Sequence, residues 1–229
     1  MTVPFAPVLG DCSTLDDLWL HVSELNRTHF PMNELQPILG GGKTFKPNIM
    51  FVFINPTVAN ISSDKNWDGP RFPFIGTRHV WKVFCRSGLI DQRLMDQIND
   101  GWSPHFAEEV LRLLEKKSFY LTNIVKWTGP DGALPDGEKI RLFLPVLKRE
   151  IELVKPEYIV TFGLIPFERL TGLRIRLSDY HTSVLHNKRL EYFDISINST
   201  KSKIVPCYFP VGRGDPKKAV DILRFVNSL

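Results

Sequence analysis

Cysteine is scarce in this sequence and is not arranged for metal binding. The 229 residues include three cysteines, Cys12, Cys85 and Cys207, which are far apart and form no CxxC pair. A structural zinc site takes four ligands at short, regular spacings, and these three positions do not supply such a set. We therefore expect reduced thiols and no metal site built on cysteine.

Long apolar runs and repeats are also missing. No stretch approaches the roughly 20 apolar residues that cross a bilayer, and the N-terminus does not combine a basic start with an apolar segment. We therefore expect no membrane contact and a protein that stays inside the cell, cytoplasmic or nuclear, rather than a secreted one.

Neither sign of charge dominates. With 29 Lys and Arg against 25 Asp and Glu, the formal net charge is +4, which suits a polyanionic partner without requiring one. The hydrophobic share of 43% and the charged share of 24% are those of an ordinary soluble protein. The length fits a single domain, residues 1–229, with a well-buried core.

Gly42-Lys43-Thr44 matches the end of a phosphate-binding loop. Such a loop also requires a glycine five residues before Gly42, where this sequence has Pro37. It must follow a strand and open a helix, whereas this stretch precedes an apolar strand and leads into Phe-Lys-Pro. We therefore expect no nucleotide site here, and we expect the glycines to form a flexible turn.

Hydrophobic patterning predicts strands that alternate with helices. The expected strands are residues 48–54, 119–125, 157–163 and 203–209. The expected helices are residues 15–25, a helix capped by Thr77, residues 94–98, residues 106–114, residues 139–154 with Pro145 inside, and a last helix from Pro216. This order predicts an α/β fold with a mostly parallel, four-stranded central sheet and helices on both faces. Ligands bind such sheets beyond the carboxyl ends of the strands.

The first strand, and the loop and helix after it, resemble the front half of the uracil-DNA glycosylase superfamily. The matching segments are Ile54-Asn55-Pro56, Phe72-Pro73-Phe74 and Val80-Trp81-Lys82-Val83, followed by Gly88. They are similar to the Gly-Ile-Asn-Pro, Phe-Pro-Phe and Phe-Trp-Lys-Val patterns of the mismatch-specific uracil/thymine branch. The first motif is most similar to that branch.

The rest of the chain resembles the iron–sulfur branch of the same superfamily. Residues 119–127 and 143–163 are similar to its Thr-Asn strand, its proline-containing helix and the following strand, and residues 208–214 stand in the place of the second motif. Arg27 and Phe30 stand where that branch has two cluster cysteines, so the resemblance implies no cluster and no other cofactor. Residues 169–195 match no pattern of the family.

Cleavage of a base from deoxyribose passes through an oxocarbenium-like sugar, with water arriving as the base departs as an anion. The site needs a group that holds the water and a slot for the extruded base. The resemblance assigns the first task to Asn55, which would orient the water by hydrogen bonding because an amide is not a strong base. The structural alternative is a turn residue before Pro56.

The resemblance assigns binding of the flipped base to two further residues. Phe74 would stack on the flipped base; its alternative is a core aromatic, in a chain that has 16 phenylalanines. Asn123 can offer a donor and an acceptor together to a pyrimidine edge; its alternative is a buried asparagine that satisfies loop backbone. Lys126 and Trp127 are expected to line the same mouth.

The second motif differs from the family pattern because Phe209 replaces its histidine. A phenylalanine cannot donate a hydrogen bond to the departing base, which predicts either a slower enzyme or a donor elsewhere. The candidates for such a donor are the backbone N–H groups of Gly212 and Gly214, and Arg213.

Basic residues around the second motif suit DNA. Arg213 could wedge into the duplex where the base came out, and Lys217 and Lys218 could hold phosphates. The alternative is a solvated basic turn.

Together these residues predict a monofunctional DNA glycosylase of base excision repair. It would remove uracil or a related deaminated base from DNA, as a monomer and without a metal or cofactor. Two alternatives stay open: a DNA- or base-binding protein that no longer cuts, as Phe209 suggests, and a hydrolase of a small nucleoside-like substrate. The prediction requires Asn55, Phe74 and Arg213 to face one another, and it gives residues 174–194 no role.

Overall fold

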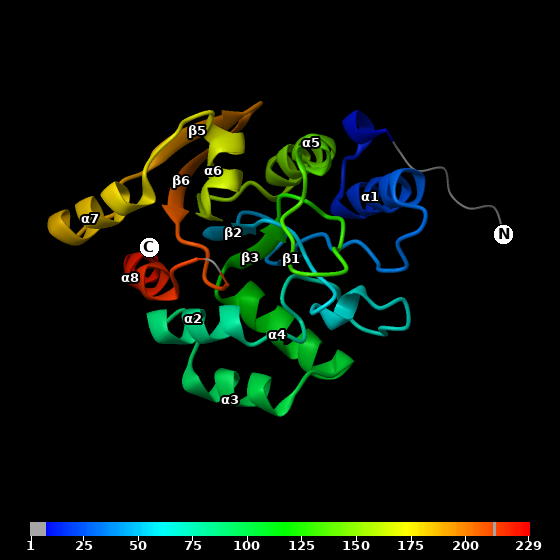
Figure 1. The fold of residues 1–229 in the computed structure, drawn as a ribbon, viewed down its shortest axis with the longest axis horizontal. Helices are drawn as coiled ribbons and strands as arrows, with labels where there is room; N and C mark the ends of the chain where they lie inside the picture. Colours follow the sequence, from blue (N-terminus) through cyan, green and yellow to red (C-terminus); the bar gives the residue numbers. More distant parts are fainter. Residues whose placement is uncertain (1–7, 213) are drawn as a thin grey trace.

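A six-stranded sheet lies between two layers of helices in the computed structural model, which describes residues 8–212 and 214–229 (Figure 1). The strands are β1 Gly41–Gly42, β2 Ile49–Phe53, β3 Phe119–Asn123, β4 Tyr158–Phe162, β5 Phe193–Ile197 and β6 Thr200–Cys207, in the order β1-β3-β2-β4-β6-β5. Strands β3, β2, β4 and β6 are parallel neighbours, and β1 and β5 add antiparallel edges. The prediction of a mostly parallel sheet is confirmed, but the predicted number of four strands is wrong, because the sheet has six.

The two edge strands were missed for different physical reasons. Strand β1 consists of two glycines, which carry no side chains to show a period. The glycines do not form the expected flexible turn. A Cβ added at Gly42 would lie 2.2 Å from the Phe119 carbonyl oxygen, so this edge is closely packed. Strand β5 joins β6 through a turn at Asn198, which has a φ of 50°, and it lies in the segment without a recognisable pattern.

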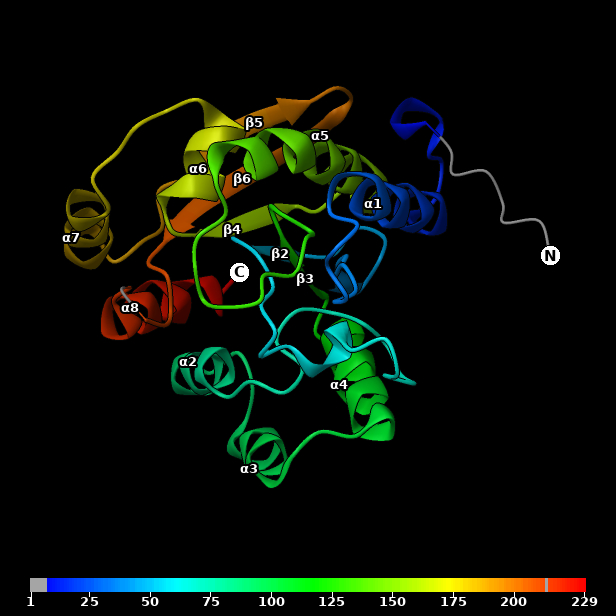
Figure 2. The ribbon, with the colours of Figure 1, turned by 45° about the vertical axis from the view of Figure 1, so that its right-hand side comes forward.

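The helices cover both faces of the sheet, as predicted. They are α1 Leu15–His29, α2 His79–Ser87, α3 Gln92–Asp100, α4 Pro104–Lys116, α5 Gly137–Val154, α6 Leu164–Thr171, α7 Leu177–Asn187 and α8 Pro216–Val226, with short 3-10 turns at Leu9–Asp11 and Ile61–Ser63. Helices α2, α3, α4 and α8 lie on one side of the sheet, and α1, α5 and α6 on the other (Figures 1 and 2). Helices α6 and α7 were not predicted, and α7 occupies the unassigned segment.

Alternation along β2 divides the core into two parts. Phe51 and Phe53 face the α2 and α4 side, and Met50 and Val52 face the α5 side. All five residues of β2 are buried, which explains why the strand reads as one continuous apolar run.

Side-chain caps set most helix starts, but Thr77 is not one of them. Thr14 caps α1 in a reciprocal capping box with Asp17. Helix α2 begins after Arg78, which makes no side-chain cap, and the Thr77 hydroxyl instead donates to the Phe74 carbonyl at 3.1 Å. Thr77 therefore stabilises the turn at Phe74 rather than the helix.

Candidate active site

The carboxyl ends of β2 and β3 bring two asparagines to the same edge of the sheet. Phe53 pairs with Asn123 in the parallel register, and hydrogen bonds continue past the strand ends from Ile124 N to Phe53 O and from Val125 N to Ile54 O, both at 2.9 Å. Asn55 therefore lies two residues beyond Phe53, the pairing partner of Asn123, at the same edge of the sheet.

The Asn55 side chain is half-buried, and only the nitrogen of its amide is hydrogen-bonded. Its Nδ2 donates to the Pro56 carbonyl at 3.1 Å, and no described residue donates to its Oδ1. The amide nitrogen is thus held by the chain, while the oxygen is left to accept a hydrogen bond. This arrangement is suited to orienting a water molecule by its hydrogens.

Asn123 has the most unusual environment in the site. Its side chain is fully buried, and neither Oδ1 nor Nδ2 has a hydrogen-bond partner among the described residues. A buried polar group left unsatisfied costs about 1–3 kcal/mol. The alternative in which Asn123 satisfies loop backbone finds no support, because the amide bonds to no described loop atom. Donor and acceptor are both available for a planar polar ligand.

Phe74 is held in a strained backbone conformation beside this edge. Its φ of 74° is in the left-handed region, which costs a non-glycine residue roughly 1–3 kcal/mol. Its carbonyl accepts hydrogen bonds from Trp81 Nε1 at 3.0 Å and from Thr77, which fixes the turn. The ring packs edge-on against Phe53, with centroids 4.4 Å apart, and Phe53 in turn stacks on Phe162.

Asn123 and Phe74 lie on the same face of the sheet. Asn123 alternates with Phe119 and Leu121, which belong to the core part that contains Phe53, and Phe74 packs against that same part. The structure therefore places Asn123 and Phe74 on one face of the sheet, and Asn55 follows the end of β2 at the same edge; their joint role in a site stays a prediction.

The loop after β3 closes on Asn55 through Gly129, a residue for which the sequence predicted no role. Thr57 and Gly129 form a parallel bridge, with hydrogen bonds from Gly129 N to Pro56 O at 2.9 Å and from Val58 N to Gly129 O at 2.8 Å. A Cβ at Gly129 would lie 3.2 Å from Trp127 and 3.4 Å from Asn55 Nδ2. Only the dipeptide Gly129-Pro130, a turn signal after a strand, could have pointed to this contact.

The second-motif loop follows β6 at the same edge of the sheet. Phe209 is partly buried and packs against both parts of the core. The backbone N–H of Gly214 donates to the Val211 carbonyl at 3.1 Å, so the expected role of Gly214 as a donor to a ligand is wrong, because its hydrogen is already used. Gly212 is exposed, has a φ of 61°, and its N–H makes no such bond with any described residue. Arg213 lies outside the described residues.

The two lysines of α8 have different surroundings. Lys217 is exposed and has no carboxylate partner among the described residues. Lys218 lies 3.6 Å from Asp215 and 5.2 Å from the centroid of the Tyr208 ring. Lys217 is therefore the freer of the two to meet an anion.

Lys126 does not line the mouth of the site. It is fully buried and forms an ion pair with the fully buried Glu150 of α5. Trp127 is half-buried, and the Lys139 ammonium group lies 4.7 Å from the centroid of its ring.

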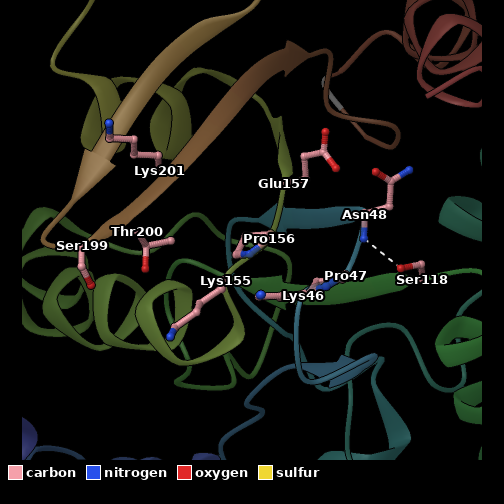
Figure 3. Close-up of a pocket in the computed structure, with 10 residues that line it drawn as sticks. All are labelled: Lys46, Pro47, Asn48, Ser118, Lys155, Pro156, Glu157, Ser199, Thr200 and Lys201. Carbon is pink, nitrogen blue, oxygen red and sulfur yellow. Dashed lines mark hydrogen bonds between the residues drawn. The ribbon is translucent and has the colours of Figure 1, made fainter.

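A cavity of about 530 Å³ lies away from these residues, at the amino ends of the parallel strands (Figure 3). Its lining includes Asn48, Ser118 and Glu157, each next to the first residue of β2, β3 or β4. It is at the edge opposite to Asn55 and Asn123, so its size does not make it the candidate site.

Neither metal ligands nor membrane spans mark the described chain. Within residues 8–212 and 214–229, no group of three His, Cys, Asp or Glu side chains could hold a metal ion. No helix in these ranges is long and apolar enough to cross a membrane. His79, close to Phe74 in sequence, is exposed at the start of α2.

Comparison with known protein families identifies a match over most of the chain. Residues 39–223 match the family model described as the uracil DNA glycosylase superfamily, a range that includes every candidate residue from Asn55 to Lys218. No curated protein matches the chain.

Proposed function

The chain belongs to the uracil DNA glycosylase superfamily, and from this premise we propose that it is a monofunctional DNA glycosylase that hydrolyses the N-glycosidic bond of uracil or a related deaminated base. The observation that carries the proposal is the fully buried amide of Asn123, which has no partner among the described residues and ends β3 beside Asn55. A base flipped out of DNA would supply the missing hydrogen bonds.

Base recognition follows from the groups that Asn123 presents. Uracil offers a carbonyl acceptor next to an N–H donor on its pairing edge, and one carboxamide can satisfy both at once. Phe74 would contribute its ring face, where base stacking is worth about 1–3 kcal/mol. The held, left-handed backbone of Phe74 would keep this ring in place before the base arrives.

Hydrolysis requires water on the far side of the sugar from the leaving base. As the glycosidic bond lengthens, the sugar gains oxocarbenium character and attracts the water oxygen. Asn55 Oδ1 would accept a hydrogen bond from that water, while Nδ2 stays bound to Pro56. No strong base is needed at Asn55 if the bond to the base breaks before the water attacks.

The assay of this proposal uses oligonucleotides that contain uracil, hypoxanthine, xanthine or a G·T mismatch, followed by alkaline cleavage of abasic sites. The protein is made in a host that lacks its own uracil glycosylase, so that any product comes from this chain. Strand cleavage with at least one base supports the proposal. Retained DNA binding with no product on any base would instead indicate a binding protein, the alternative suggested by Phe209.

Phe209→His is expected to raise the rate on uracil at least tenfold, because it adds a donor toward the departing base. An oxyanion donor contributes about 2.7–4 kcal/mol in well-aligned sites, and a new one should recover part of that. Single-turnover rates measure the effect, with Phe209→Leu as the control that changes the ring without adding a donor. An unchanged rate for the histidine variant would mean that the donor lies elsewhere, with Gly212 N–H the first candidate.

Gly129→Ala is expected to lower the single-turnover rate about tenfold with little loss of stability. The added methyl group must push Trp127 or Asn55 by a few tenths of an ångström, and small displacements of a catalytic group are costly in rate. Gly132→Ala is the matched control, because Gly132 is in the same loop and a Cβ there meets nothing within 4 Å. Equal rates for the two variants would contradict a role for this contact.

A further inference from the structure

We propose that the buried ion pair between Lys126 and Glu150 positions Asn123 for base recognition. The inference rests on the proposed function and adds two residues to it that touch neither base nor sugar. They would act from the opposite face of the sheet, through the backbone of Asn123.

The Lys126 ammonium group holds the last carbonyl of β3. Its Nζ donates to the Asn123 carbonyl oxygen at 2.7 Å and to Thr122 Oγ1 at 2.5 Å, and it pairs with a carboxylate oxygen of Glu150. Both ionic side chains are fully buried. The carbonyl of the proposed base-reading residue is thus fixed by a side chain.

Glu150 joins three parts of the fold, its own helix included. Its carboxylate accepts hydrogen bonds from Tyr120 Oη at 2.9 Å, from Thr122 Oγ1 and from the backbone N–H of Gly40 at 3.0 Å. Helix α5, strand β3 and the segment before β1 therefore meet at one carboxylate. Burial, and then the charge of Glu150, raise the pKa of Tyr120 well above its ordinary value, which keeps the phenol protonated as a donor.

The ionisation of Lys126 depends on Glu150. Burial lowers the pKa of Lys126, and the Glu150 carboxylate acts against that shift. Removing the carboxylate alone would leave a buried ammonium group without its counter-charge, so single substitutions are expected to disturb folding as well as position.

A positioning role explains why two charged side chains, Lys126 and Glu150, are buried in the core. Buried ion pairs are weak sources of stability, and apolar replacements of similar volume are often tolerated. On the other face of the same strand, the Asn123 amide makes no hydrogen bond with any described residue. Since that amide is not held directly, its placement depends on its backbone, and Lys126 holds that backbone.

The test replaces both charges at once, with Lys126→Met and Glu150→Leu in one variant. We expect it to fold and to lose ten- to hundredfold in kcat/KM on uracil-containing DNA, chiefly through a higher KM, since small displacements of a binding group are costly. Inhibition by free uracil should weaken by a similar factor. Arg149→Met with Glu152→Leu is the matched control, because that pair, at 2.7 Å on the same helix, contacts Cys12 O rather than Asn123.

A second readout does not depend on activity. The NMR order parameter of the Asn123 side-chain amide should fall in the Lys126/Glu150 variant and stay unchanged in the Arg149/Glu152 variant. Equal kinetics and equal order parameters for the two variants would overturn the positioning role while leaving the glycosylase proposal intact. If the unmodified protein cleaves no base, the glycosylase proposal fails, and the order parameters alone decide whether the pair positions Asn123.

Discussion

Replacing Asn123 with leucine is expected to abolish most activity and at the same time to stabilise the fold. Two hydrogen bonds to the base would be lost, each worth about 0.5–1.5 kcal/mol, which lowers kcat/KM ten- to hundredfold. The folded protein no longer buries an unsatisfied amide, so the free energy of unfolding should rise by about 1 kcal/mol. Urea denaturation and single-turnover cleavage measure the two effects on the same preparation.

The control for this variant is another buried asparagine with the opposite hydrogen-bond status. Asn60 is as inaccessible, but its Nδ2 donates to Phe72 O at 2.9 Å and its Oδ1 accepts from Ser62. Asn60→Leu should therefore destabilise the protein. If both leucine variants are destabilised alike, the Asn123 amide must have a partner in the free protein, and the base-reading role loses its physical basis.

Asn55→Ala is expected to reduce the rate of base removal by a factor of roughly 10², because the attacking water would no longer be held in position. DNA binding and thermal stability should change little, since the one hydrogen bond lost joins Asn55 to the adjacent Pro56. Single-turnover rates and fluorescence anisotropy with a uracil-containing duplex separate the two effects.

Two further variants sharpen the Asn55 experiment. Asn55→Asp keeps an oxygen acceptor and should restore much of the rate lost in the alanine variant. Asn66→Ala changes an exposed asparagine of the same long loop and should behave like the unmodified protein. A full rate for Asn55→Ala would assign Asn55 to the turn alone, the alternative that the sequence left open.

The parallel part of the sheet could be predicted because its strands are buried on both faces. The uninterrupted apolar run of β2 is typical of that environment, and β3 begins with Phe119-Tyr120-Leu121 before its polar end. The shared direction of the two strands brings Asn55 and Asn123 to the same edge of the sheet. The edge strands lack such a signal: β1 has no side chains, and β5 alternates between partly buried and exposed residues. Helices α6 and α7 are short, and their apolar faces pack on other elements of the fold: α6 contacts β4, β5 and β6, and α7 contacts β6 and α8.

The sequence predicts individual site residues but not the contacts between residues that are distant in the chain. Asn55, Phe74 and Asn123 belong to motifs, whereas the partner of Lys126 is 24 residues away on a helix and no local pattern joins them. The sequence therefore predicts Lys126, with Trp127, at the mouth of the site, whereas it is fully buried. The approach of Gly129 to Asn55 also arises from tertiary structure, through the bridge to Thr57. The requirement that Arg213 face Asn55 and Phe74 stays a prediction.

The bridge between Thr57 and Gly129 has a mechanical consequence. It extends the β2–β3 pairing beyond the strands, so hydrogen bonds hold together the loop that carries Asn55 and the loop that carries Trp127. Past the end of β6, the described residues around Gly212 form no comparable bridge to a neighbouring loop. Room for DNA in the proposed site would then come from movement on the β6 side, while the loop that carries Asn55 keeps its position.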